Sequence, residues 1–157
     1  MRNWGARLLL AGLTTGITDG LFACVMALVN GSTVMRLWQN VAFVLLGKPS
    51  FDGGWRTAGI GLLMHFGVAF AWSAIFLLLY ANWQWLQRQG IVKVALVYGP
   101  MIWLVMSLVV IPLILHRPPT INARWWIQLI GHFPFVGLPI VSCIARPALR
   151  RMDEAPA

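Results

Sequence analysis

The stretch Gly61-Leu-Leu-Met-His-Phe-Gly-Val-Ala-Phe-Ala-Trp72 places one ionisable ring, His65, inside a run of residues that are otherwise apolar or small. The run is about 25 residues long, which is enough to span the roughly 30 Å hydrocarbon core of a bilayer. Its centre recurs later in the chain, because Leu129-Ile-Gly-His-Phe133 repeats the Leu-x-x-His-Phe pattern around His132. We therefore predict two membrane helices that each carry a His-Phe pair within the span.

The composition excludes an ordinary water-soluble domain. Of the 157 residues, 59% are hydrophobic and only 10% are charged, whereas soluble domains carry about 25% charged residues. The net charge of +8 comes from basic residues at the ends of apolar runs, where lipid headgroups and membrane orientation explain them. No basic patch is interleaved with stacking aromatic residues, so we expect a lipid bilayer as partner and no nucleic acid.

Hydropathy predicts an all-α membrane protein, a single integral membrane domain over residues 1–157. The first apolar segment is interpreted as a retained span, because Asp19 and three threonines interrupt it in a way that is unusual for a cleaved signal. The transmembrane helices are expected at about 8–29, 57–80, 91–115 and 124–144. Residues 146–157 form a polar tail.

A shorter segment over about 33–46 has helical spacing but is too short to span. Its apolar positions recur every three or four residues, while Arg36, Gln39 and Asn40 fall between them. This pattern is typical of an amphipathic helix that lies in the membrane interface.

Small residues in the first two predicted spans indicate close helix packing. Gly12, Gly16 and Gly20 recur every four residues, and Gly67 and Ala71 form a second such series. Small residues at this spacing let another helix approach closely within a bilayer. Cys24 and Cys143 fall inside spans without the spacing of metal ligands, so they are interpreted as packing residues.

The candidate site consists of Asp19, His65 and His132. Each histidine follows the predicted start of its span by eight residues, so both imidazoles are expected about 12 Å below the same membrane face. Asp19 is expected at about the same depth, counted from the opposite face. A carboxyl group at this depth must face the bundle interior, and Thr15, one turn earlier, is expected to donate to it.

Three explanations of this polar cluster remain open at this point. The histidines can donate interhelical hydrogen bonds, to Asp19 or to the carbonyl freed by Pro134, which contribute about 0.6 kcal/mol each. Alternatively, His65 and His132 are axial ligands of a b-type haem. As a third alternative, Asp19, His65 and His132 move a proton or another cation across the membrane.

Enzymatic motifs are absent from the sequence. It has no activated Ser or Cys near a His, no paired carboxylates and no phosphate-binding loop with a Lys. We therefore expect a non-enzymatic protein without a metal or cofactor, apart from the haem alternative. Because little of the chain extends beyond the membrane, the leading hypothesis is a scaffold or accessory subunit that packs against other membrane proteins or against itself.

The second half of the chain resembles uncharacterised bacterial inner-membrane proteins of the YagU-like type. The resemblance extends loosely over about two thirds of the chain and implies a small multi-span protein of the bacterial inner membrane, without implying an activity. The similar residues are His65-Phe66, Tyr80, Tyr98-Gly99, Ile111-Pro112-Leu113, Arg117-Pro-Pro119, Gly131-His-Phe133 and Gly137-Leu-Pro139.

The sequence also predicts an internal repeat. The first two spans are similar to the last two, with Gly16 matching Gly99 and His65 matching His132, which suggests two repeated hairpins.

The orientation in the membrane is predicted from the basic residues. Seven of them fall on the side of the termini and five on the other side. This bias favours cytoplasmic N- and C-termini.

Overall fold

The computed structural model describes residues 3–153, and every regular element in this range is helical. Four helices in the described range are long and apolar enough to cross a membrane, at Trp4–Val29, Gly54–Asn82, Ile91–Leu115 and Ala123–Ala145. A shorter apolar helix, α2 (Val34–Leu46), follows the first of them. The protein is thus an all-α, multi-pass membrane protein, as predicted.

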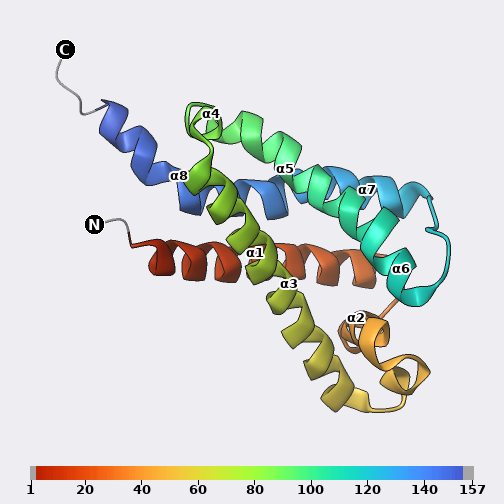
Figure 1. Ribbon diagram of the computed structural model, residues 1–157. Helices are drawn as coiled ribbons and strands as arrows, with labels where there is room; N and C mark the ends of the chain where they lie inside the picture. The colour runs from red at the N-terminus through yellow and green to blue at the C-terminus, as the bar shows by residue number, and fades with distance from the viewer. Residues whose placement is uncertain (1–2, 154–157) are drawn as a thin grey trace.

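The spans divide into the labelled elements of Figure 1. The first two are unbroken helices, whereas each of the last two contains a five-residue π-helical turn. In chain order the elements are α1 (Trp4–Val29), α2, the 3₁₀ turn η1 (Lys48–Phe51), α3 (Gly54–Asn82), α4 (Gln84–Gln87), α5 (Ile91–Val105), the π-turn η2 (Met106–Val110), α6 (Ile111–Leu115), α7 (Ala123–His132), the π-turn η3 (Phe133–Gly137) and α8 (Leu138–Asp153).

The helices extend beyond the predicted spans at several ends. The α1 helix begins at Trp4, where the Asn3 side chain accepts a hydrogen bond from the backbone N–H of Ala6. The last helix continues to Asp153, so residues 146–153 of the expected polar tail are helical, and residues 154–157 lie outside the described residues. Hydropathy predicts where the chain leaves the apolar part of the membrane. A helix can continue beyond that point, because it ends only where its backbone hydrogen bonds end.

The first, third and fourth spans pack together, and the second span, α3, crosses them (Figure 1). The α1 helix packs against α8 and η3, and α5 packs against α7, η3 and α8. The α3 helix crosses α1 steeply, and its first half extends away from the other spans together with α2. This arrangement leaves the first half of α3 covered chiefly by α2.

The inward face of α2 differs from the predicted one. Trp38, Gln39 and Ala42 are its buried residues. Gln39, which was expected on the polar side, is only 1% exposed and donates from Nε2 to the carbonyl oxygen of Gly54 at 3.1 Å. The expectation for Gln39 was wrong because a buried amide is tolerated where a backbone carbonyl accepts its hydrogen bond.

The glycine series of α1 accepts side chains of α3. A Cβ atom at Gly12 would collide with the ring of Phe70, and one at Gly16 with the ring of Phe66. Gly20 lies beside His65, whose Nε2 would be 3.4 Å from a Cβ atom there. The groove is therefore filled within the chain, so it is not a free surface for another protein.

The second small-residue series faces away from the bundle. Gly67 and Ala71 are both exposed, and no atom lies within 4 Å of the position of a Cβ at Gly67. In the described part of the chain, no helix covers this face of α3. These two residues therefore have no packing role inside the protein.

Proline positions coincide with the irregular turns of the last two spans. Proline has no N–H, so Pro139 frees the carbonyl of Phe135 from its normal helical partner. The hydroxyl of Thr18 on α1 donates to this oxygen at 2.6 Å. Such side-chain substitution keeps proline tolerable in a membrane helix, and here it joins α1 to η3. The sequence also suggested that a histidine donates to the carbonyl freed by Pro134. His65 and His132 instead bond the carbonyl oxygens of Gly16 and Gln128.

We expect Thr18→Val to destabilise the folded protein by roughly 1–2 kcal/mol, because it leaves the freed carbonyl of Phe135 without its donor. Thr14→Val is the matched control, since the Thr14 hydroxyl donates to Leu10 of its own helix at 2.7 Å and has only a longer contact to another helix, 3.5 Å from Sγ of Cys143. Thr18→Ser should retain most of the stability. Unfolding in mixed micelles measures the effect, and equal stability of Thr18→Val and Thr14→Val would contradict the assigned bond.

A packed apolar core occupies the half of the bundle nearer the chain termini. Its most deeply buried members include Ile140, Val141 and Ile144 of α8 and Phe76 of α3. Tyr98 joins this core and donates its hydroxyl proton to the carbonyl oxygen of Trp72 at 2.8 Å. The core closes the bundle on this side.

Candidate functional site: a polar cavity within the bundle

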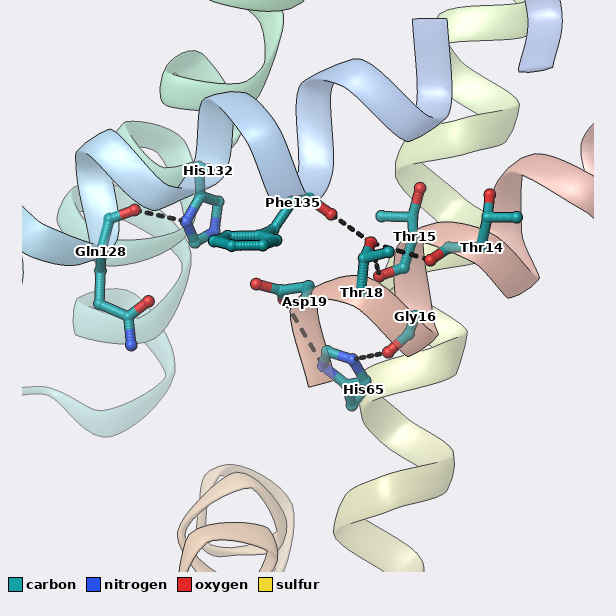
Figure 2. Close-up of polar contacts among 9 residues, drawn as sticks. All are labelled: Thr14, Thr15, Gly16, Thr18, Asp19, His65, Gln128, His132 and Phe135. Atoms are coloured by element: carbon teal, nitrogen blue, oxygen red, sulfur yellow. Dashed lines mark hydrogen bonds and ion pairs between the residues drawn. The ribbon is translucent and has the colours of Figure 1, made fainter. Parts of the chain in front are cut away.

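A cavity of about 230 Å³ lies between the spans, and Asp19, His65 and His132 all line it. Asp19 comes from α1, His65 from α3 and His132 from the end of α7. Figure 2 shows the Asp19 carboxylate between the two imidazole rings. The three residues that the sequence singled out are thus brought together around one cavity. We call it the polar cavity.

The geometry of His65 defines which of its nitrogens carries a proton. Its Nε2 is 2.9 Å from the carbonyl oxygen of Gly16, and because a carbonyl can only accept, Nε2 must be the donor. In a neutral imidazole the other nitrogen, Nδ1, then carries a lone pair. Nδ1 is 4.0 Å from Oδ2 of Asp19, and the two side chains are 14% and 20% exposed. Two acceptor atoms therefore face each other across a gap.

His132 also bonds a backbone carbonyl through one ring nitrogen. Its Nδ1 is 2.7 Å from the carbonyl oxygen of Gln128, one turn earlier in α7. Nδ1 is therefore the donor, and Nε2 of the neutral ring keeps a lone pair. The ring is 8% exposed, and its centroid is 4.9 Å from that of Trp103. Both histidines thus direct their proton to a backbone carbonyl and keep an acceptor.

Two further polar atoms at the cavity have no hydrogen-bond partner in the described residues. These are Oγ1 of Thr15 and Nε1 of Trp103. Thr15 is only 2% exposed. The expectation that Thr15 donates to Asp19 was therefore wrong. Buried polar groups normally find a partner, which is often an ordered water. The cavity is large enough for several water molecules, and these unsatisfied atoms are their natural contacts.

A bis-histidine haem does not fit this arrangement. Axial ligation requires one ring nitrogen of each histidine to be directed at the iron. Nε2 of His65 is bonded to Gly16, and Nδ1 faces Asp19, which itself lies between the two rings (Figure 2). The haem alternative would need His65 to give up its present bond.

Sequence reasoning did not identify Trp103 and Gln128 as part of the site. Gln128 precedes His132 by four residues and so shares its helix face, a signal that could have found it. Trp103 offers no such signal, because tryptophan in a span is usually a packing or interfacial residue. The two cysteines are free and do not line the polar cavity.

Comparisons with protein-family models, with curated proteins and with solved structures found no match for this chain. A functional assignment therefore depends on the chemistry of the polar cavity and on the surfaces of the bundle.

Proposed function

We propose that this chain is a small non-enzymatic membrane protein whose functional centre is a proton-binding site in the polar cavity. The supporting observation is the pair of acceptor atoms, Nδ1 of His65 and Oδ2 of Asp19, that face each other at 4.0 Å. Two facing acceptors repel each other unless a proton or a donating water lies between them. Uptake of a proton converts this repulsion into a charge-assisted contact.

The position of the pair within the membrane strengthens this proposal. Ionisable residues inside spans are costly, and they commonly serve proton relays when they face a cavity. His132 supplies another imidazole on the opposite side of the Asp19 carboxylate (Figure 2). Among the described residues that line the cavity, Asp19, His65 and His132 are the titratable ones. Titratable groups from three spans thus line the cavity in which the proposed proton is held.

The test is ¹⁵N NMR of the histidine ring nitrogens in micelles. Asp19→Asn replaces a carboxylate acceptor by an amide that can donate to Nδ1 of His65, so the Nδ1 resonance of His65 should move. His116, exposed in the loop after α6, provides an internal control whose resonances should stay unchanged. An Nδ1 resonance of His65 that is identical in wild type and Asp19→Asn would reject the proposed site.

A second candidate function is assembly with other membrane proteins or with a second copy. The observation that favours it is the uncovered face of α3 with Gly59, Leu63, Gly67 and Ala71. Among the described spans, α3 also buries the smallest share of its residues. Small residues on a lipid-facing surface favour helix association, because they permit close backbone contact.

We expect Gly67→Leu to reduce association in proteoliposomes, measured by energy transfer between labelled copies or by loss of co-purifying subunits. Leu63→Ile is the matched control, because it keeps the bulk of the same face. Unchanged association of Gly67→Leu would remove α3 as the assembly surface. Under either function we propose a location in the bacterial inner membrane with cytoplasmic termini, supported by the YagU-like resemblance and the charge bias.

A further inference from the structure

A second hollow adjoins the polar cavity on the side of the α1–α2 connection. Its volume is about 240 Å³, and it is lined by α1, α2, the residues between them and α7. We call this hollow the vestibule. Ala23 and Gln128 line both the vestibule and the polar cavity. The two spaces are therefore neighbours, with the side chains of Ala23 and Gln128 between them.

The vestibule has a polar lining near the membrane face. Asn30, Ser32, Asn40 and Gln128 contribute neutral polar side chains, and Asn30 and Asn40 are exposed. Water therefore finds hydrogen-bonding partners from the surface down to Gln128, which lies one turn from His132 on α7. Polar side chains of this kind, set among the apolar residues Ala23, Met26, Ala27 and Leu37, permit hydration of a space within a membrane bundle.

The opposite side of the polar cavity is apolar. Val136 and Ile140 line the cavity there, and both are members of the packed core, with Ile140 fully buried. The core separates the cavity from the membrane face at which α1 begins and α3 ends. Water that enters from the vestibule thus meets a closed apolar layer.

The groups that line the two spaces indicate which species binds. Among the described residues that line the vestibule the charged one is Arg124, so this lining lacks a carboxylate that would attract a metal cation. The atoms that face each other in the polar cavity are a ring nitrogen and one carboxylate oxygen. This pair favours a proton as the species that is held at Asp19.

We infer that the polar cavity exchanges protons with water on one side of the membrane only, through the vestibule between α1, α2 and α7. This inference rests on the proposed proton-binding function and adds to it the sidedness and the species. The accessible side is the one that bears Asn30 and Arg124. In this conformation the proton-binding site is open to water from one membrane face, and the protein does not form a continuous channel.

The test is cysteine labelling from each side of sealed vesicles of known orientation. Single cysteines replace Ala27 in the vestibule, Ala23 at the junction and Ala11 in the apolar core, in a Cys24→Ala/Cys143→Ala background. A charged, membrane-impermeant methanethiosulfonate is the probe. Thr120→Cys marks the vestibule side, because Thr120 lies in the exposed loop after α6, and Gln84→Cys marks the opposite side.

Ala27→Cys and Ala23→Cys are expected to react from the side on which Thr120→Cys reacts, and Ala11→Cys from neither side. Reaction of Ala23→Cys from both sides, or its protection while Ala27→Cys reacts, would overturn the one-sided route. Gln128→Cys repeats the junction test if Ala23→Cys fails to fold. These readouts measure water access, so they can fail independently of the NMR test of His65 and Asp19→Asn.

The species is tested with wild-type protein. Adding Na⁺ or K⁺ at constant ionic strength should leave the ¹⁵N resonances of the His65 ring unchanged, because neither cation binds at the site. A His65 resonance that moves with the concentration of either cation would overturn this part of the inference.

Discussion

Gly99→Val is expected to destabilise the fold more than any other substitution considered for this chain. A Cβ atom at Gly99 would overlap the carbonyl oxygen of His132 and would lie 3.0 Å from the backbone nitrogen of Gly137. Both neighbours are backbone atoms, so they cannot rotate away as a side chain would. Overpacking typically costs about 1–3 kcal/mol, and we expect more than about 3 kcal/mol here because α5 and η3 must separate.

Thermal unfolding in mild detergent measures this effect. Gly59→Val is the matched control, because Gly59 is also in a span and has no atom within 4 Å of its Cβ position. That control should be neutral or slightly stabilising, since valine is a better helix former than glycine. A Gly99→Val protein as stable as Gly59→Val would show that α5 and η3 do not pack as described.

Gly61→Val should detach α2 from α3. A Cβ atom at Gly61 would overlap the carbonyl oxygen of Trp38 and would lie 3.0 Å from the backbone nitrogen of Ala42. The cost should again exceed about 3 kcal/mol of packing free energy, because two backbones meet at this point. Unlike Gly99→Val, this change should leave the contacts between α1, α5 and α8 in place.

Hydrogen exchange over residues 34–46 measures the detachment. We expect fast exchange of α2 in Gly61→Val, with α5 and α8 still protected. Because the ring centroid of Trp38 is 5.2 Å from that of His65, the His65 ring resonances should also move. Gly59→Val, two residues away on the same helix, should show neither change, and full protection of α2 in Gly61→Val would contradict the contact.

The spans and the cluster of titratable residues follow from simple rules of the sequence. A bilayer has a fixed thickness, so runs of apolar residues predict the spans well. Counting residues from the span ends put Asp19, His65 and His132 at similar depth, and the structure brings all three to one cavity. Depth along a helix can be counted, because the rise per residue is constant.

Direction around a helix is harder to predict within a membrane. When a helix is apolar on all sides, periodicity cannot separate the lipid-facing side from the buried side. Gly12 and Gly67 illustrate this, because both belong to small-residue series, yet Gly12 packs on Phe70 and Gly67 faces outward. Gly16 and Gly99, which the sequence matched to each other, also differ in the atoms that they meet, with Gly16 against the ring of Phe66 and Gly99 against the backbone of His132.

The π-turn η3 has a consequence for the spacing of residues along the last span. An ordinary helical bond joins residues four apart, whereas the N–H of Leu138 bonds the carbonyl of Phe133, five residues earlier. Each π-turn therefore contains one residue more than an α-helical turn. In a regular helix two residues eight apart, such as His132 and Ile140, would point about 80° away from each other. The extra residue of η3 brings them close to two full turns apart, so both can line the polar cavity. Removing one residue between 133 and 137 would convert η3 into an ordinary helical turn and leave the direction of α8 nearly unchanged, whereas the same deletion within α8 would turn the rest of that helix by about 100°.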